Sequence, residues 1–384
     1  MLIDLKQASA WASDYLNRNI TSCNISYLLQ YGRINRYGGK GCPLIKIDEL
    51  KKYYDSYNKE KELKKKFGKD LNWHLSFTEY KESERTKHVH RLHLYKGKFI
   101  PQLVKYFLDS NTDQFKKEKF FNKGNIVLDP FCGSGTTLIQ ANELGINAIG
   151  IDISAFNAML SNAKIKKYNI SDIKQSAYNI TAKLENFQKT KNNTAFEENL
   201  LAELTEFNRL YFPSPEYKIK ARKGEIDEKK YAKDKEKKFS NVYFDLVKKY
   251  KIKITQNNNS SFLDKWFLFP VREEINCILN ELNKIKNNNI KKILAIILSR
   301  TLRSCRATTH ADLGTLKKPV IKTYYCKKHG KICKPLFSIA NWWKRYVKDT
   351  VKRISEFDKV RTDTFQKCLA GDSRTINIES ETKK

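Results

Sequence analysis

The sequence has no long hydrophobic run, no leader-like start and few cysteines, and each of these absences argues against a class of protein. No stretch of 18 apolar residues occurs, so no membrane-spanning helix is expected. The first residues, MLIDLKQASAWASDYL, are amphipathic with an early acid, unlike a signal peptide. The eight cysteines among 384 residues are scattered beside aliphatic residues, which fits a reducing compartment better than a disulfide framework. We therefore expect a cytoplasmic protein of two or three domains, with no membrane partner.

Acidic residues are scarce relative to basic ones. The 42 Asp and Glu residues oppose 74 Lys and Arg residues, which leaves a formal charge of +32. This excess indicates a polyanionic partner, most simply nucleic acid and less directly an anionic membrane surface. Lys-Asn runs of the kind that an AT-rich genome produces account for part of the charge. The charge therefore supports a nucleic-acid partner without identifying it.

The first 57 residues predict a small module of three helices and a hairpin. Apolar residues at helical spacing predict one helix over LKQASAWASDYL and another over TSCNISYLLQYGRI, capped by Thr21 or Ser22. The glycines of RYGGKGCPLIKI predict a hairpin, and Asp48 is expected to cap a third helix. This order resembles an excisionase-like winged helix-turn-helix, although a small helical docking module has the same pattern. In the DNA-contacting arrangement, the residues facing a groove are Ser22, Asn24, Tyr27, Gln30 and Arg33.

The stretch LDPFCGSGTT, residues 128–137, reads as a strand that ends in an acid, a turn through two glycines, and the start of a helix. A phosphate-binding loop needs a lysine, and none lies between Asp129 and Thr137. A dinucleotide-binding turn needs a third glycine, whose place Leu138 occupies. The remaining interpretation is a turn that binds S-adenosylmethionine. There a second acid, Asp152 at the end of INAIGIDIS, accepts hydrogen bonds from the ribose hydroxyls.

The longer stretch LDPFCGSGTTLIQANELGINAIGIDIS closely resembles the S-adenosylmethionine motif of the amino DNA methyltransferases, which methylate N4 of cytosine or N6 of adenine. HLYKGKFIPQLVKYFL is similar to the segment that closes over the methionine end of the cofactor in this family. LAGDSR resembles a strand whose acid meets the adenine ring. The resemblance covers roughly residues 88–165 and 342–376, and it implies a prokaryotic restriction-modification system. The cofactor contacts that it implies are Lys98, Phe99, Pro101, Asp129, Pro130, Phe131, Cys132, Gly133, Ser134, Gly135, Thr136, Thr137, Asp152 and Asp372.

The motif with which this family holds the target amine is absent. It consists of Asp, Asn or Ser, then Pro-Pro and an aromatic residue that stacks on the flipped-out base. The chain has no Pro-Pro pair, and in its nearest look-alike, FPSPEY, no apolar strand leads to Ser214, Pro215 and Tyr217. The motif is expected to end the strand after Asp372, but the sequence stops twelve residues later. We therefore assign no catalytic residue and expect a second polypeptide to supply the motif, because an incomplete sheet leaves an unpaired edge. A truncated relic is the alternative.

The stretch YYCKKHGKICKP has the spacing Cys-x2-His-x3-Cys, given by Cys326, His329 and Cys333. Cys305 and His310 lie upstream. The spacing permits three zinc ligands without requiring them, because buried thiols and a surface histidine give the same pattern. No metal is assigned on this ground. The alternating histidines of HVHRLH are interpreted as strand or loop residues beside the cofactor-closing segment, and Trp342 and Trp343 as core residues of a helix.

Taken together, these patterns predict an α/β protein: a partial Rossmann-like sheet of an S-adenosylmethionine-dependent methyltransferase, with an N-terminal winged helix-turn-helix and a mostly helical insertion. The insertion is a candidate target-recognition region, where Arg303 and Arg306 are expected to contact DNA. The predicted order is a DNA-contacting module at 1–57, a linker at 58–87, the cofactor-binding core at 88–169, the insertion at 170–341 and a return to the core at 342–384.

The predicted function is transfer of a methyl group from S-adenosylmethionine to an exocyclic amine in double-stranded DNA, with cytosine N4 slightly favoured over adenine N6. One alternative is a non-catalytic DNA-binding or specificity subunit, or a relic, which failure to bind the cofactor would indicate. Another is a methyltransferase acting on amines of RNA, which indifference to duplex DNA would indicate.

Overall fold

The computed structural model describes residues 1–17, 19–30, 32–39, 43–57, 77, 80–122, 124–256, 261–310, 312 and 316–379. These residues form two compact units, each assembled from segments that are distant in the sequence. Unit 1 consists of Met1–Glu79, Asn192–Phe269 and Ala307–Phe337, and unit 2 of Tyr80–Lys191, Pro270–Arg306 and Ser338–Lys384. The stretch 170–341 contributes to both units, and most of the predicted linker at 58–87 lies outside the described residues.

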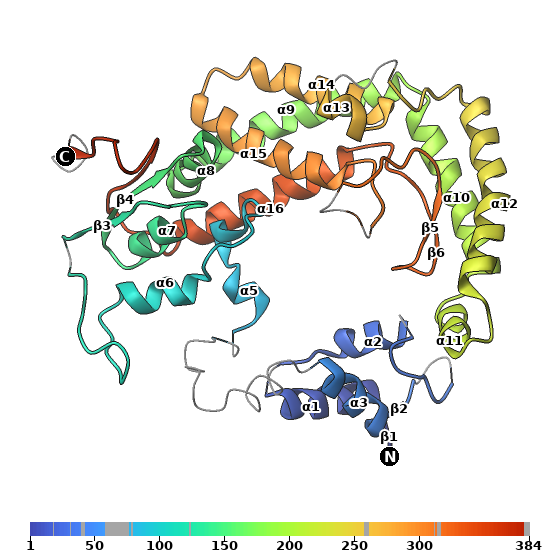
Figure 1. Ribbon diagram of the computed structural model, residues 1–384. Coiled ribbons are helices and arrows are strands. Elements are labelled where there is room, and N and C mark those ends of the chain that lie inside the picture. Colours follow the sequence, from blue (N-terminus) through green and yellow to red (C-terminus); the bar gives the residue numbers. More distant parts are fainter. Residues whose placement is uncertain are drawn as a thin grey trace. The chain divides into compact units, whose positions relative to one another are not determined.

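Unit 2 contains a three-stranded parallel sheet in the order β3-β4-β7. The strands are β3 (Ile126–Asp129), β4 (Asn147–Asp152) and β7 (Gln366–Ala370). In the register of the sheet, Asp129 lies opposite Gly150, and Asp152 lies opposite Ala370. Because the strands are parallel, their carboxyl ends meet at one edge, although β7 lies more than 200 residues after β4 along the chain (Figure 1).

Two helices, α7 (Thr136–Glu143) and α8 (Ala155–Ile165), pack against this sheet and against each other. A third, α6 (Pro101–Leu108), packs against α7. Side chains alternate along β3: Val127 is buried, whereas Ile126 and Leu128 are 40% and 48% exposed. Among the described residues β3 pairs with β4 alone, so its other edge has no strand beside it there.

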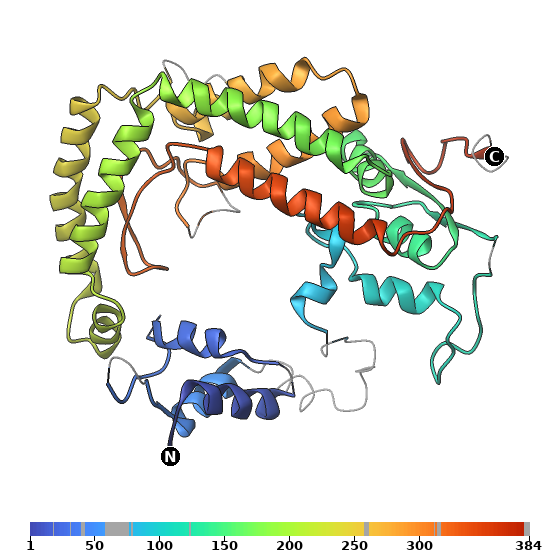
Figure 2. The ribbon, with the colours of Figure 1, turned by 180° about the vertical axis from the view of Figure 1, so that it is seen from behind.

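Long helices form the rest of unit 2. In α9, buried Ile173, Ala177, Ile180 and Leu184 recur at helical spacing, which gives the helix an apolar face. Figure 2 shows α9 and α16 side by side, and the indole N–H of the buried Trp343 in α16 donates to Thr181 Oγ1 at 3.0 Å. Trp343 thus occupies the predicted core position. The helices of this layer are α9 (Ile170–Lys189), α14 (Phe269–Asn283), α15 (Asn288–Ser304) and α16 (Ala340–Asp358).

The start of unit 1 is a small module with its own core. The predicted helical faces are confirmed, because Ala8 and Ala12 are buried in the first helix, and Ile25, Leu28 and Leu29 in the second. The third helix begins at Ile47, two residues earlier than expected, so Asp48 lies in its first turn and is not its cap. The elements are β1 (Leu2–Ile3), α1 (Leu5–Leu16), α2 (Ser22–Gln30), β2 (Ile45–Lys46) and α3 (Ile47–Tyr57), with β1 antiparallel to β2.

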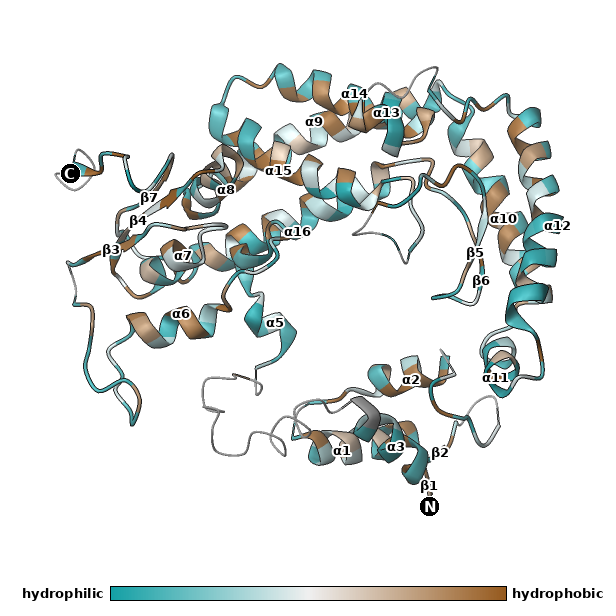
Figure 3. Cartoon of the chain, viewed as in Figure 1, coloured by the Kyte–Doolittle hydropathy of each residue, from teal (hydrophilic) through white to brown (hydrophobic). Residues whose placement is uncertain are grey.

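The rest of unit 1 is mainly helical, with one small hairpin. In Figure 3 the ribbon of α12 is coloured mostly as hydrophilic. Its aromatic residues Phe239 and Tyr243 are fully buried. The elements are α10 (Asn193–Tyr211), α11 (Glu216–Lys223), α12 (Glu228–Lys249), α13 (Phe262–Trp266), β5 (Tyr324–Cys326) and β6 (Lys331–Cys333).

Two short helices precede α6 in unit 2, namely α5 (Glu82–Arg85) and the 3-10 helix η3 (His88–Arg91). The histidines of HVHRLH therefore begin in a helical turn, which differs from the predicted strand or loop. In the described ranges, no helix combines the length and the apolarity that crossing a bilayer requires.

Candidate active site

Three acidic residues follow the three strands of the sheet. Asp129 ends β3, Asp152 ends β4, and Asp372 comes two residues after the end of β7. The backbone N–H of Gly371 donates to the carbonyl of Asp152 at 3.0 Å, which places Asp372 beside the end of β4. In parallel α/β sheets ligands bind at this carboxyl edge. The sheet therefore gathers the three acids that the sequence assigned to the cofactor.

The turn after β3 needs both of its glycines. Gly133 and Gly135 have φ angles of +55° and +79°, which residues with side chains rarely adopt. A Cβ at Gly135 would also lie 2.9 Å from Ser161 Oγ on α8. The chain is held to β4 by the Cys132 N–H, which donates to the carbonyl of Ile151 at 2.9 Å. The glycines thus allow a tight turn and a close approach of α8.

The carboxylate of Asp152 organises this edge. Its Oδ2 accepts the N–H of Gly133 at 2.8 Å. Its Oδ1 accepts the N–H of Ser154 at 2.8 Å and a side-chain N–H of Asn157 at 3.1 Å. An ionised carboxylate has about four acceptor positions, and these three bonds leave one for a hydroxyl of a ligand.

Large apolar side chains stand exposed around the same strand ends. Phe131 and Ile153 are each 82% exposed, and Phe99 is 65% exposed. Ile153 directly follows Asp152, and Phe131 follows Asp129 with only Pro130 between them. Such a group of apolar side chains beside polar ones is typical of a surface that a ligand covers. Ile153 was not among the predicted contacts.

A buried lysine also lies at the turn. Lys164 of α8 is fully buried, and its Nζ donates to the carbonyl of Ser134 at 2.6 Å. No carboxylate of the described residues forms an ion pair with it. Burial, with a further contribution from Lys98, lowers the pKa of Lys164 to about 7. The predicted contact Lys98 is itself partly buried, and its Nζ donates to the carbonyl of His90 at 2.7 Å. Sequence reasoning missed Lys164, since nothing in the helical pattern distinguishes it from a surface lysine.

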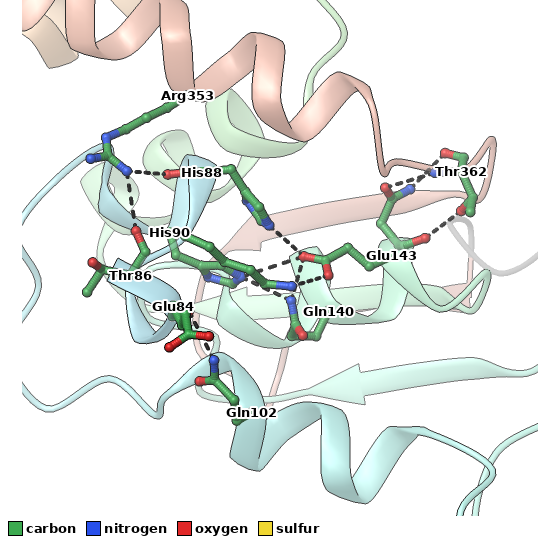
Figure 4. Close-up of polar contacts among 11 residues, drawn as sticks. Glu84, Thr86, His88, His90, Gln102, Gln140, Glu143, Arg353 and Thr362 are labelled. Atoms are coloured by element: carbon green, nitrogen blue, oxygen red, sulfur yellow. Dashed lines mark hydrogen bonds and ion pairs between the residues drawn. The ribbon is translucent and has the colours of Figure 1, made fainter. Parts of the chain in front are cut away.

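A polar network fastens the segment before α6 to α7 (Figure 4). The side-chain amide of Gln140 donates to His90 Nε2 at 3.1 Å and to Glu143 Oε1 at 2.7 Å. His88 Nε2 lies 2.8 Å from the same Glu143 oxygen, and Arg353 donates to the His88 carbonyl at 3.2 Å. Burial and neighbouring cations lower the pKa of His90 well below its ordinary value, so this imidazole is neutral. The network supports the segment that carries Lys98, Phe99 and Pro101.

The other predicted contacts lie as follows. Pro101 is buried as the first residue of α6, and Thr136 and Thr137 open α7, whose first-turn N–H groups point toward the edge. The carboxylate of Asp372 accepts hydrogen bonds from the Arg374 side chain, which lower the pKa of Asp372. Arg374 was not predicted, and it lies where Asp372 would meet a ligand.

The residues expected to contact DNA fall in two places. On α2, Tyr27 is half-exposed and Gln30 is exposed, and Arg33, which follows the helix, is exposed as well. Ser22 is partly buried. The Asn24 side chain accepts a hydrogen bond from the Thr21 N–H at 2.9 Å. These five residues belong to unit 1. Arg303 and Arg306 belong to unit 2, at the end of α15, where Arg306 Nε donates to the Arg303 carbonyl at 3.2 Å.

The look-alike motif FPSPEY lies in unit 1, whereas the sheet that carries the three acids belongs to unit 2. Tyr217 is 3% exposed, and its ring packs against Phe212, Tyr231 and Tyr325. A ring enclosed in this way is not free to stack on a base. The structure thus supports the interpretation of this segment as a chance resemblance.

Comparison with known proteins gives the family. A family model described as DNA methylase matches residues 43–163. The Type II methyltransferase M.MjaII of Methanocaldococcus jannaschii is 42% identical over 393 residues, covering all of this chain and 72% of its own length. M.MvaI of Kocuria varians is 34% identical over 107 residues, 28% of this chain and 22% of its own. A probable tRNA (guanine(10)-N2)-dimethyltransferase of Methanothermococcus thermolithotrophicus is 42% identical over 64 residues, 14% of this chain and 40% of its own. No solved structure gives a significant match.

The match to M.MjaII bears on two predictions. It does not support the expected second polypeptide, because this relative is a single methyltransferase chain longer than the aligned part. It does support the resemblance on which the cofactor turn was interpreted, and it extends that resemblance over the whole sequence. The chain belongs to the amino DNA methyltransferase family and is an S-adenosylmethionine-dependent DNA methyltransferase.

Proposed function

We propose that this enzyme methylates an exocyclic amine within a specific double-stranded DNA sequence, cytosine N4 ahead of adenine N6, as the modification enzyme of a restriction-modification system. The observation that carries the proposal is the sheet edge where Asp129, Asp152 and Asp372 follow three neighbouring parallel strands beside a two-glycine turn. The names of the relatives M.MjaII and M.MvaI, both Type II methyltransferases, support the DNA substrate.

The nucleoside part of the cofactor lies over the ends of β4 and β7. Asp152 would accept a hydrogen bond from a ribose hydroxyl through its remaining acceptor position. Ile153 packs against the adenine ring, since an exposed apolar side chain beside the ribose-binding acid suits a flat aromatic base. Asp372 accepts from the adenine amine once Arg374 has moved aside.

The methionine part lies over the glycine turn. The backbone from Cys132 to Gly135 approaches the ligand closely because neither glycine has a side chain. Asp129 would hold the ammonium group, and Lys98 and Lys164 would hold the carboxylate, which favours the charged form of Lys164. The exposed ring of Phe99 would hold the sulfonium, because its positive charge favours an aromatic face. Pro130, Phe131 and Ser134 complete the turn.

The reaction itself is an in-line displacement. The amine nitrogen attacks the methyl carbon, the bond between carbon and sulfur breaks, and the sulfur leaves as the neutral thioether of S-adenosylhomocysteine. The nitrogen then loses one proton to an acceptor or to water. Correct alignment of the methyl group supplies much of the acceleration, and the residues named above hold the cofactor for it.

The amine of the target base needs acceptors for its hydrogens, which the polar-Pro-Pro-aromatic motif provides in this family. We propose that the strand that carries it lies along the edge of β3 that is unpaired among the described residues, beside the exposed Ile126 and Leu128. Its two candidate sources are a longer form of this chain, as the length of M.MjaII favours, and a second polypeptide.

DNA is bound by the positively charged surface. In the proposal α2 is the recognition helix of a winged helix-turn-helix, with Asn24, Tyr27 and Gln30 toward the base edges and Ser22 and Arg33 toward the backbone. Arg303 and Arg306 contact phosphates, which positions the duplex without reading its sequence.

The test is methyl transfer from labelled S-adenosylmethionine to duplex DNA, followed by mass spectrometry of the nucleosides. The arms are the 384-residue chain, the chain extended by any continuous reading frame, and the chain with the product of the neighbouring gene. N4-methylcytosine or N6-methyladenine in an arm identifies the base and the source of the motif. Methylation of RNA in preference to duplex DNA, or no cofactor binding in any arm, contradicts the proposal.

A further inference from the structure

Four nitrogen- or sulfur-bearing side chains converge at the hairpin β5–β6 of unit 1. One donor atom from each of His310, Cys326, His329 and Cys333 lies within 4.8 Å of every other. Three of these residues belong to the Cys-x2-His-x3-Cys stretch. The fourth comes from a segment 16 residues before Cys326. All four belong to one compact unit, so their convergence is a property of that unit alone.

The hairpin brings its own three residues together. Cys326 ends β5 and Cys333 ends β6, and the pairing of Tyr324 with Cys333 puts both cysteines on the same face of the hairpin. The turn between them is tight: Gly330 has φ +63°, and its N–H donates to the carbonyl of Cys326 at 2.7 Å. The His329 N–H donates to the same carbonyl at 3.0 Å. His329 is thereby turned back toward the two sulfurs.

His310 reaches the cluster in a fixed orientation. Its Nδ1 lies 2.8 Å from the hydroxyl of Tyr324, and its backbone N–H donates to the same oxygen at 3.1 Å. The other ring nitrogen, Nε2, is thereby left for the cluster. A histidine whose second nitrogen is held by a hydrogen bond is the usual arrangement in metal sites, because the bond fixes the tautomer and the ring plane.

The spacing of the donors fits a tetrahedral ion. Zinc bonds of about 2.3 Å to sulfur and about 2.0–2.1 Å to nitrogen put the ligand atoms about 3.3–3.8 Å apart. His329 Nδ1 lies 3.5 Å from Cys333 Sγ, within this range, and the rings of His310 and His329 are 4.3 Å apart. Closing the widest separation, 4.8 Å or less, requires a shift of about an ångström.

The surroundings are those of a small structural site. Cys326 and Cys333 are 3% and 7% exposed, and among the described residues their apolar cluster comprises Tyr324 and the partly buried Val320 besides themselves. A core of this size stabilises two three-residue strands poorly. Two thiolates and two imidazoles match the preference of zinc over harder cations.

A second group of three potential metal ligands, His88, His90 and Glu143, lies in unit 2. Two of its members already have other partners, because Gln140 donates to both His90 Nε2 and Glu143, and Lys87 pairs with Glu143. At the hairpin, the described contacts leave the donor atoms facing one another.

We propose that His310, Cys326, His329 and Cys333 bind one zinc ion in a closed Cys2His2 site that ties the segment at His310 to the hairpin β5–β6. With all four positions taken by protein ligands, the ion is structural and takes no part in methyl transfer. Binding couples to folding, since the site does not exist in the unfolded chain. The proposal is independent of the function proposed above.

The test is the metal content of the purified 384-residue chain, after incubation with Zn²⁺ and removal of excess, by plasma mass spectrometry. We expect about one zinc ion per chain, and loss of that zinc in Cys326→Ser, Cys333→Ser and His329→Ala. His329→Cys replaces one zinc ligand by another and is expected to retain the metal, which separates loss of a ligand from loss of the fold. Cys277→Ser, in α14 of unit 2, is the matched control and is expected to retain it as well.

Two further measurements use the same proteins. A chelator is expected to lower the midpoint of thermal unfolding of the wild-type chain and of Cys277→Ser, and to leave Cys326→Ser unchanged. Co²⁺ in place of Zn²⁺ is expected to give the visible absorption of a tetrahedral thiolate complex. Zinc content in the wild type no higher than in Cys326→Ser overturns the proposal. So does a count of six free thiols in place of eight in the denatured, metal-free chain, because it indicates a disulfide.

Discussion

The backbone N–H of Gly133 donates a hydrogen bond to Oδ2 of Asp152 at 2.8 Å. The carboxylate that ends β4 therefore holds the turn that follows β3, so that two neighbouring strand ends are joined by one side chain. Because Asp152 also accepts from Ser154 and Asn157, its position is set before any ligand arrives. A cofactor hydroxyl then meets an acceptor that is already oriented, which reduces the entropy lost on binding.

Replacing this carboxylate is expected to weaken cofactor binding strongly. Asp152→Ala removes a charge-assisted hydrogen bond worth about 1.5–3 kcal/mol, which corresponds to an increase in Kd of about 10- to 150-fold. Isothermal titration calorimetry with S-adenosylmethionine measures the change. Asp363→Ala, an exposed carboxylate of the same unit, is the control and leaves the affinity unchanged. Equal affinities for wild type and Asp152→Ala would remove Asp152 from the site.

The second glycine of the turn is expected to resist substitution for two separable reasons. Gly135→Ala combines an unfavourable φ of +79° with a Cβ 2.9 Å from Ser161 Oγ, whereas Gly145→Ala has a similar φ of +72° and open space around it. We expect both variants to be destabilised by about 1 kcal/mol or more, with Gly135→Ala the worse of the two. Urea unfolding measures the difference, and Ser161→Ala in the Gly135→Ala background is expected to recover part of it. Equal losses in the two single variants would show that the contact with Ser161 costs nothing.

The buried Lys164 is expected to make stability depend on pH in the alkaline range. Its pKa in the folded chain is about 7, against an ordinary value of 10.5. Between these two values the unfolded chain binds the proton and the folded chain does not, so the free energy of unfolding rises with pH by up to about 1.4 kcal/mol per pH unit. Below the lower pKa both states are protonated, and the effect of pH disappears. Denaturant unfolding from pH 6 to 10 tests this, with Lys164→Met as the variant whose profile is flatter.

Cofactor binding is expected to change the protonation of Lys164. A carboxylate bound beside Lys164 favours its charged form and raises its pKa, so binding near pH 8 takes up a proton. Calorimetry in buffers of different ionisation enthalpy measures the uptake, which Lys164→Met abolishes. A wild-type enzyme that binds the cofactor without proton uptake would place the carboxylate elsewhere.

The DNA contacts are expected to separate into two kinds. Arg303→Ala lowers the slope of log affinity against log salt by about 0.9 if it removes one phosphate contact, and weakens binding to all sequences alike. Gln30→Ala leaves the slope unchanged and loses about 1–3 kcal/mol of preference for the recognition site over other DNA. Arg209→Ala, whose exposed arginine on α10 pairs with Glu206, is the control that changes neither quantity. Fluorescence anisotropy with labelled duplexes at several salt concentrations distinguishes these outcomes.

Local patterns predicted the parts of the fold whose signals lie close together in the sequence. The strand, turn and helix from Ile126 to Glu143 follow from an apolar run that ends in an acid and two glycines. The buried faces of α1 and α2 follow from helical spacing. A strand was also predicted at LAGDSR, and the structure has β7 there. This strand was recognised although its neighbour β4 lies far from it in the chain.

Features that depend on distant contacts were not predicted. The burial of Lys164 arises from the approach of Ser134 and Lys98, which no helical pattern reveals. The histidines of HVHRLH were predicted as strand or loop residues, whereas His88 and His90 lie in the 3-10 helix η3 and contact Glu143 and Gln140 of α7. The spacing of three of the proposed zinc ligands was visible in the sequence, whereas the convergence of His310 on the hairpin depends on the fold.

We propose that the edge formed by β3, β4 and β7 binds S-adenosylmethionine for methyl transfer to DNA. Calorimetric titration of the purified chain with S-adenosylmethionine, beside Asp129→Ala and Asp152→Ala, is the first experiment to make. We expect one binding site per chain that both substitutions weaken. Binding that neither substitution changes, or no binding by a chain that is shown to be folded, would contradict it.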